Sequence, residues 1–393
     1  MPVNQSRTVR YVPNGAFLPT EHERAAHRHI AGRLADIMHW PFGGEWADSS
    51  RRPPEPTYFV PCHTITCEAA SACGIGGVDD LFGGVVPHAH VATKVITHGL
   101  VSPRAAAPPG WCETFAEAVG EVVLDGYSVF DRGDLERAAR KLWLQGPVRV
   151  KQPEGIGGQG QHVVGNAVQL ALLLDTAASS DENLALEGLV LEQDLADVVT
   201  LSVGQLRLGG IDVSYYGRQS STLNNRGVPV YGGSELWCVR GGFDALDVLA
   251  PDANTRLAIR QARTYHEAAL RCFPGIVLSR ANYDVAQGLD AQGQWRSGVL
   301  EQSWRAGGAS AAEIEAVAIL LQQSPSRSVH AVTVEIDPRT GGIRLLRYVV
   351  AEDAGRLINP MIVDGQVKGG VAQGIGKALY EQVSYDADGQ IQN

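Results

Sequence analysis

Apolar and polar positions at the start of the chain follow first the period of a strand and then the period of a helix. Residues 8–13 (TVRYVP) are rich in β-forming side chains, and the stretch after them places Ile30 and Leu34 on one helical face. A second β-rich stretch, residues 56–61, follows a proline-rich loop. This strand–helix–strand order predicts a small N-terminal α/β domain at residues 1–92.

The pattern changes at residue 93, and strands and helices up to residue 325 predict a second domain. Asn166 precedes one helix as an N-cap, and Ser310 and Glu313 have the spacing of a capping box at the start of another. The predicted fold class is therefore α/β (α+β). The expected strands are residues 147–152, 161–164, 188–195, 199–208, 212–219, 234–241, 282–288 and 297–304, and the expected helices are residues 92–100, 134–146, 166–177, 254–273 and 310–323.

The last stretch, residues 328–393, has a pattern of its own. Residues 330–350 predict a β-hairpin, and a glycine-spaced segment follows at residues 365–379. The sequence then stops shortly after a further strand begins. We therefore expect a short, truncated hairpin–helix segment in this region.

Composition and charge narrow the classes of function. The 393 residues carry a formal net charge of −10, which argues against a surface that coats nucleic acid. No apolar run approaches the roughly 18–20 residues needed to cross a bilayer. The first residues lack the apolar centre of a signal peptide. We expect a cytoplasmic protein with neither nucleic-acid nor membrane partners, and oligomerisation stays open.

The glycine-rich stretch GIGGQG at residues 155–160 lies between two predicted strands. A dinucleotide-binding loop would open a helix, and a Walker loop would end in Gly-Lys-Ser/Thr. A protein-kinase loop would be followed by downstream signatures that this sequence lacks. The remaining arrangement is Lys151 at the end of a strand, followed by a flexible flap that surrounds phosphates with backbone N–H groups. The alternative is an ordinary hairpin with a surface lysine.

Polar residues on later strands indicate the same chemistry. Glu192 ends an apolar strand where the chain turns, a position from which an acid accepts hydrogen bonds from adenine or ribose. Asp284 lies within a strand, and period two places Glu301, Ser303 and Arg305 on one sheet face. Two strand-borne carboxylates facing one cavity hold Mg²⁺ against a triphosphate, and a nearby arginine stabilises a transferring phosphoryl group. The alternative for the two carboxylates is ordinary surface ion pairing.

Together these features resemble the ATP-grasp superfamily of carboxylate ligases, such as biotin carboxylase and D-alanine ligase. The resemblance covers roughly residues 93–320, with a lid at about residues 147–190. Residues 1 to about 325 look like a bacterial biotin-carboxylase-like or ligase-like family within that superfamily. The resemblance implies ATP contacts from Lys94, Lys151, Gly155, Gly157, Gly158, Gly160, Glu192, Gln193 and Leu195, Mg²⁺ ligation by Asp284, Glu301 and Ser303, and catalytic roles for Lys151 and Arg305.

The activity implied by this resemblance is that of an ATP-dependent carboxylate–amine (or related) ligase. ATP would phosphorylate a small-molecule carboxylate to an acyl-phosphate, and a nucleophile would then displace the phosphate. Arg218 is expected to border the acceptor site, and Asp197 is the acid nearest the expected ribose position. Ser303 departs from the family's usual asparagine, so the alternative is a degenerate module that binds nucleotide without turnover.

Residues 331–393 are similar to a different family, the large subunit of molybdenum hydroxylases such as xanthine and carbon-monoxide dehydrogenases. The segment GGVAQGIG lies in the molybdopterin-binding portion of that family. A fragment of a molybdopterin-binding oxidoreductase is therefore a third hypothesis for function. Because the match covers only a small part of such a subunit, we expect no molybdopterin chemistry from this chain alone. Gene fusion or an artefact of sequence assembly would explain the join.

Overall fold

The computed structural model contains two compact units, Met1–Leu321 and Gln322–Asn393. The chain mixes helices with sheets, which confirms the predicted α/β class. The residues that the structure describes are 6–14, 21–47, 51–155, 160–176, 181–223, 229–321, 327–337, 339–353, 360–380, 384–385 and 391–392.

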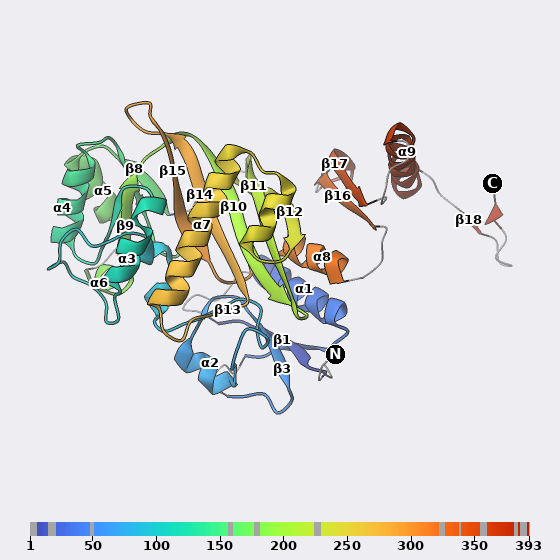
Figure 1. Ribbon diagram of the computed structural model, residues 1–393, viewed down its shortest axis with the longest axis horizontal. Helices are drawn as coiled ribbons and strands as arrows, with labels where there is room; N and C mark the ends of the chain where they lie inside the picture. The colour runs from blue at the N-terminus through green and yellow to red at the C-terminus, as the bar shows by residue number, and fades with distance from the viewer. Residues whose placement is uncertain are drawn as a thin grey trace. The chain divides into compact units, whose positions relative to one another are not determined.

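A three-stranded parallel sheet forms the N-terminal part of the first unit (Figure 1). Its central strand is β1 (Thr8–Val12), with β2 (Phe42–Glu45) on one side and β3 (Thr57–Pro61) on the other. The apolar face of α1 (Glu21–Met38) packs against β1, as the helical spacing of its apolar residues predicts. The predicted strand–helix–strand order is confirmed, and β2 is an additional strand.

The segment that carries Lys94 differs from the predicted helix at residues 92–100. It forms two short 3₁₀ turns, η1 (Ala89–Ala92) and η2 (Lys94–Thr97), separated by Thr93 in an extended conformation. The hydroxyl of Thr93 accepts a hydrogen bond from the backbone N–H of Val95 (3.3 Å). This local cap and the run of β-branched residues compete with a continuous α-helix, so the prediction of a helix was wrong.

Small elements connect the N-terminal sheet to the larger ones. A second three-stranded sheet has the order β13-β5-β4, so that a strand from late in the chain completes it. The elements of this part are β4 (Ile65–Thr66), α2 (Cys67–Cys73), β5 (Gly84–Val86), α3 (Glu113–Val119), η3 (Gly120–Val122) and β13 (Val277–Leu278).

A four-stranded antiparallel sheet carries the glycine-rich loop between two neighbouring strands. Its order is β6-β9-β7-β8, and helices α4, α5 and α6 lie beside it (Figure 1). Asn166 accepts a hydrogen bond from the Gln169 N–H (3.0 Å), which confirms the predicted N-cap of α5. The bounds are β6 (Gly126–Val129), α4 (Arg132–Leu142), β7 (Val148–Lys151), β8 (Gln161–Val164), α5 (Ala167–Thr176), α6 (Asp181–Glu187) and β9 (Leu189–Gln193).

A five-stranded antiparallel sheet, ordered β12-β11-β10-β14-β15, forms the centre of the first unit. Helix α7 covers one face of this sheet (Figure 1), and α1 and α8 pack against part of the other face. The bounds are β10 (Ala196–Leu208), β11 (Ile211–Leu223), β12 (Pro229–Arg240), η4 (Phe243–Leu249), α7 (Ala253–Cys272), β14 (Arg280–Leu289), β15 (Trp295–Ser303) and α8 (Ser310–Leu321).

The start of α8 differs from the predicted capping box. The carboxylate of Glu313 is fully buried and accepts two hydrogen bonds from the guanidinium of Arg280, at 2.6 and 2.9 Å. The hydroxyl of Tyr215 donates a third at 2.6 Å. The spacing of Ser310 and Glu313 therefore marks the helix start. The glutamate, however, forms a buried ion pair with Arg280, which lies on a strand distant in the sequence.

The second unit has few elements. Its hairpin exposes Val332, Val334 and Ile336 on one strand. None of the helices in the described part of the chain is long and apolar enough to span a membrane. The elements are β16 (Arg327–Ile336), β17 (Ile343–Asp353), α9 (Pro360–Leu379), β18 (Ser384–Tyr385) and β19 (Ile391–Gln392).

Candidate functional site

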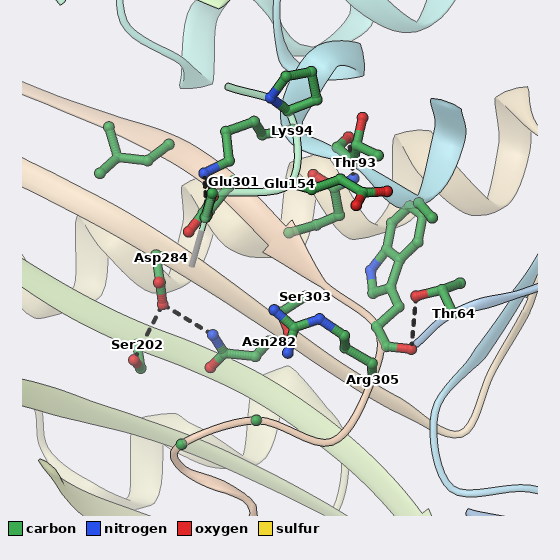
Figure 2. A pocket seen from close by; sticks show the side chains of 18 of the residues that line it. Thr64, Thr93, Lys94, Glu154, Ser202, Asn282, Asp284, Glu301, Ser303 and Arg305 are labelled. Atoms are coloured by element: carbon green, nitrogen blue, oxygen red, sulfur yellow. Dashed lines mark hydrogen bonds and ion pairs between the residues drawn. The ribbon is translucent and has the colours of Figure 1, made fainter. Parts of the chain in front are cut away.

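A cavity of about 1000 Å³ in the first unit gathers most of the residues singled out by the sequence (Figure 2). Gly160 does not line it, has a φ of 68° and accepts a hydrogen bond from the N–H of Gln152. Gly157 and Gly158 lie outside the described residues. The predicted residues that line the cavity are Lys94, Lys151, Gly155, Glu192, Gln193, Leu195, Asp284, Glu301, Ser303 and Arg305.

Lys94 links the glycine-rich loop to strand β15. Its side chain is only 3% exposed, and its ammonium forms an ion pair with the carboxylate of Glu301 (Figure 2). The same ammonium donates a hydrogen bond to the carbonyl oxygen of Gly155 at 2.8 Å. The short 3₁₀ turn η2, which the structure shows in place of the predicted helix, therefore positions the buried positive charge of Lys94 at the cavity.

Lys151 and Glu192 form a second buried ion pair, between neighbouring strands β7 and β9. The ring of His98 lies 3.2 Å from the other carboxylate oxygen of Glu192. Burial by itself raises the pKa of Glu192, but the charge of Lys151 and the hydrogen bond with His98 outweigh it and lower the pKa to about 2. Glu192 is therefore ionised at neutral pH. The cavity wall thus contains a negative charge on Glu192 beside the positive charge of Lys151.

Asp284 and Glu301 occupy directly opposed positions on β14 and β15. Asp284 accepts hydrogen bonds from Ser202 (3.2 Å), Gln219 (2.9 Å) and Asn282 (2.9 Å). Burial raises the pKa of Asp284, and the negative charge of Glu301 adds to the rise. Two adjacent carboxylates that repel each other suit a divalent cation, and Lys94 supplies one positive charge there.

The described residues contain no group of three or more His, Cys, Asp or Glu side chains placed to hold a metal ion. This does not conflict with a magnesium site, because Mg²⁺ uses one or two carboxylates together with substrate phosphates and water. The donor set of Asp284 and Glu301 therefore fits magnesium that arrives with a nucleotide.

Ser303 and Arg305 lie at the end of β15, where Arg280 organises the main chain. Arg280 donates to the Ser303 hydroxyl at 3.2 Å and to the carbonyl oxygens of Ser303 (2.9 Å) and Arg305 (2.5 Å). Burial and the charge of Arg280 lower the pKa of Arg305. A Cβ atom on Gly307 would lie 3.8 Å from the Ser303 hydroxyl and 3.9 Å from Arg305, so these groups surround this glycine.

The cationic residues of the cavity differ in their partners. Among the described residues, Lys94, Arg149, Lys151 and Arg280 each form an ion pair with a carboxylate. Within the same part of the chain, Arg305 has no carboxylate at salt-bridge distance and donates to the carbonyl oxygen of Ala306. Arg305 thus differs from these four cations in forming no salt bridge within the described part of the chain.

Several residues of the site were missed by the sequence analysis. They hold the predicted residues in place and come from other strands or turns, so only register or tertiary contact reveals them. Asn282 had a signal, because it lies two positions before Asp284 on the same strand face. The missed residues that contact predicted ones are His98, Ser202, Gln219, Arg280 and Asn282.

The position of Arg218 corrects one expectation. Arg218 and Asp197 line a separate cavity of about 270 Å³, whereas Gln219 and Ser220 line the large one. Arg218 lies 3.6 Å from Asp252 and its side chain is 62% exposed. Because neighbouring strand residues point to opposite faces, Arg218 points away from the large cavity and the prediction that it borders the acceptor site was wrong.

A family model decides where this chain belongs. The model of the family described as "Protein of unknown function (DUF3182)" matches residues 14–342. The chain belongs to this family. The match includes the lining residues of the large cavity from Asn14 to Ala309, whereas the lining residue Val12 precedes the matched range.

Two solved structures are similar to this DUF3182 chain. D-alanyl-alanine synthetase A from Vibrio cholerae O1 biovar eltor str. N16961 is 13% identical, with 76% of this chain and 89% of that chain covered and a TM-score of 0.46. N5-carboxyaminoimidazole synthetase from Staphylococcus aureus is 13% identical, with 88% of this chain and 81% of that chain covered and a TM-score of 0.45. Because both TM-scores are below 0.5, the functional proposal rests on the site.

A curated relative matches a short part of the sequence. The nicotine 6-hydroxylase large subunit of Paenarthrobacter nicotinovorans is 48% identical over 66 residues, which make up 17% of this chain and 8% of that protein. The chain spans less than a tenth of the length of the curated relatives it matches.

Proposed function

We propose that this chain is an ATP-grasp ligase that uses Mg-ATP to activate a small-molecule carboxylate and passes it to a nucleophile. The observation that carries the proposal is the convergence on one cavity of two buried lysines and two directly opposed carboxylates. Lysines neutralise a triphosphate and carboxylates hold its magnesium, and a cavity of this size accommodates a nucleotide with a small acid.

The ion pairs suggest how the site accepts its nucleotide. Lys94 and Lys151 each hold a carboxylate, and phosphate oxygens are alternative partners for the same ammonium groups. If Lys94 turned to phosphate, Glu301 and Asp284 would be available to hold magnesium, which would neutralise part of the charge of the triphosphate. Glu192, Gln193 and Leu195 lie at the end of β9, where we place the adenine.

The proposed reaction has two steps. A carboxylate oxygen of the acid attacks the γ-phosphorus of ATP, so that an acyl-phosphate forms and ADP leaves. A nucleophile, usually an amine, then attacks the acyl carbon and displaces inorganic phosphate. Arg305, with no carboxylate partner among the described residues, stabilises the charge of the transferred phosphoryl group.

Calorimetric titration of Mg-ATP into the intact chain tests the proposal. We expect binding at micromolar strength, and we expect Lys151→Ala and Glu301→Ala each to weaken it by at least about tenfold, since a charged hydrogen bond contributes roughly 1.5–3 kcal/mol. Matched controls are Lys368→Ala and Glu136→Ala, which remove exposed charges in ion pairs outside the cavity. Absence of binding by the folded chain would end the ligase proposal.

Ser303 favours a second candidate, a module that binds nucleotide without turnover. Its hydroxyl already accepts from Arg280, and it offers no amide oxygen to a metal. This candidate predicts Mg-ATP binding but no ADP release with any pair from a panel of carboxylic acids and amines. Detection of acid-dependent ADP release would exclude it. A redox role based on the short curated match is a separate proposal, and metal analysis of the purified chain tests it.

A further inference from the structure

Three partly exposed cysteines lie around the carboxyl end of α7, and none of them lines the large cavity. Cys272 is the last residue of α7, Cys112 directly precedes α3, and Cys67 begins α2. The thiol of Cys112 donates a hydrogen bond to the carbonyl oxygen of Cys272 at 3.6 Å. The thiol of Cys67 donates to the carbonyl oxygen of Gly275 at 3.5 Å. Elements that are distant in the sequence therefore bring thiols to one short stretch of main chain.

Cys112 and Cys272 also share a contact with a third side chain. The hydroxyl of Thr114 lies 3.2 Å from the sulfur of Cys112 and donates to the sulfur of Cys272 at 3.9 Å. Thr114 is exposed and both cysteines are partly exposed, so the pair lies at the surface. Because a single hydroxyl group contacts both sulfurs, the two thiols are neighbours across the contact between α3 and α7.

Aromatic packing fixes the two segments that carry these thiols. The buried rings of Phe115 and Phe273 have centroids 4.9 Å apart, and Phe115 also packs edge-on against Tyr265 of α7 at 5.1 Å. Helices α3 and α7 pack against each other along this contact (Figure 1). Since large buried rings dominate the packing of a core, the folded chain keeps Cys112 and Cys272 close together.

A purely structural role for Cys112 is the alternative. The last carbonyl groups of a helix have no partner within the helix, and the Cys112 thiol donates to one of them at the end of α7. Such a cap needs a donor at position 112 and no particular side chain at position 272. A sulfur atom on both members of the contact distinguishes a redox pair from a cap.

We propose that Cys112 and Cys272 form a reversible disulfide by exchange with a low-molecular-weight disulfide such as oxidised glutathione. One protein thiolate attacks the small disulfide, which breaks its S–S bond and releases one small thiol. The other protein thiolate then attacks the mixed disulfide, forms the bond between the two cysteines and releases the second small thiol. The two protein sulfurs are oxidised, the two sulfurs of the small disulfide are reduced, and two protons pass from the protein thiols to the small thiols.

This disulfide has a consequence for stability that does not depend on the proposed ligase function. It would join positions 160 residues apart in the sequence. Closing so long a loop removes many conformations from the unfolded chain, and the bond stabilises the fold where the native geometry accommodates it. The oxidised chain should therefore resist unfolding better than the reduced chain.

Peptide mapping by mass spectrometry tests the inference on the intact chain. The reduced chain is equilibrated with oxidised and reduced glutathione, free thiols are alkylated, and the peptides are separated without reduction. We expect peptides linked through Cys112 and Cys272 to be about tenfold or more abundant than glutathione adducts at either residue, because the second thiol is held in place by the fold. Dithiothreitol should remove the link. The matched control is Cys238→Ser, which removes another partly exposed thiol and should form the same link.

Three results would overturn the inference. The first is a chain that stays reduced or that carries only glutathione adducts, since the two sulfurs then do not meet in the folded chain. The second is a link between Cys67 and Cys272 in place of the proposed one. The third is a lower urea midpoint of unfolding for the linked parent than for the reduced parent. We expect a higher midpoint for the linked parent, and no difference between the same two conditions for Cys112→Ser.

Discussion

Asp284 and Glu301 face each other across neighbouring strands, and Lys94 holds the Glu301 carboxylate. This arrangement places two negative charges side by side at the cavity. One of them, Asp284, accepts hydrogen bonds from three side chains. Burial, and after it the charge of Glu301, raises the pKa of Asp284, so it costs free energy to keep both carboxylates ionised. Carboxylates kept together despite repulsion indicate a binding role more than a stabilising one.

Replacement of Asp284 by asparagine tests this cost. We expect Asp284→Asn to stabilise the nucleotide-free chain by about 0.5–2 kcal/mol, because the repulsion with Glu301 disappears while the amide oxygen still accepts hydrogen bonds. Urea unfolding in the presence of EDTA measures the change. Mg-ATP binding should weaken at the same time. A variant that is less stable than the parent would show that Asp284 contributes to the fold through its charge.

Replacement of Glu192 should lower the stability of the chain, whereas replacement of Asp284 should raise it. Its pKa in the folded chain, about 2, lies below the ordinary value of 4.5, so its ionised form stabilises the folded state at any pH above the ordinary value. That contribution is lost as the pH falls from 4.5 through 2. We expect Glu192→Gln to lower the free energy of unfolding at pH 7 by about 3 kcal/mol, following the size of the pKa shift.

Unfolding curves of Glu192→Gln and the parent at several pH values check the sign. The difference between them should be constant from pH 7 down to about 5 and should shrink below pH 4.5 as Glu192 of the parent is protonated. A difference that stays constant to pH 2 would mean that the side-chain shape, and not its charge, stabilises the strand pair.

Local pattern was enough to place much of the candidate site. Glu301, Ser303 and Arg305 all line the cavity, although Arg305 follows the end of β15 and the intervening Gln302 and Trp304 also line the cavity. The strand that ends at Lys151 and the turn after Glu192 were also readable, because apolar runs bounded by glycine or polar residues mark buried strands.

The partners of these residues were not readable, because register and tertiary contact decide them. Arg280, which neutralises Glu313, lies on a strand 33 positions earlier, and nothing in the sequence near Glu313 shows this pairing. The local spacing alone therefore favoured the capping-box interpretation. Lys94 was assigned to a helix, since lysine and its neighbours tolerate one, whereas the hydroxyl of Thr93 and tertiary burial favour a 3₁₀ turn.

Lys94 and a metal ion should compete for Glu301. We expect Lys94→Met to bind Mn²⁺ several-fold more tightly than the parent in the absence of nucleotide, because the ammonium no longer occupies the carboxylate. The same variant should bind Mg-ATP more weakly, since it has lost a phosphate partner. Paramagnetic relaxation of water protons measures the Mn²⁺ affinity, and Lys368→Met serves as the control. Equal Mn²⁺ affinities would show that Glu301 is not a metal ligand.

The buried pair of Arg280 and Glu313 should show strong coupling between its two members. Their side chains are 1% and 0% exposed, so removal of one partner leaves an uncompensated charge in the core. We expect Arg280→Met and Glu313→Leu each to destabilise the chain by about 3–5 kcal/mol. The double variant should cost much less than the sum, because it contains neither charge.

A double-mutant cycle measured by urea unfolding tests that coupling. The pair of Arg33 and Glu315 is the matched control, since it joins the same residue types at 2.5 Å with side chains 37% and 48% exposed, and its coupling should stay below about 1 kcal/mol. Additive effects for Arg280 and Glu313 would show that the pair is solvated. Because Arg280 also binds the main chain of Ser303 and Arg305, its loss should weaken Mg-ATP binding, whereas the Arg33 variant should bind normally.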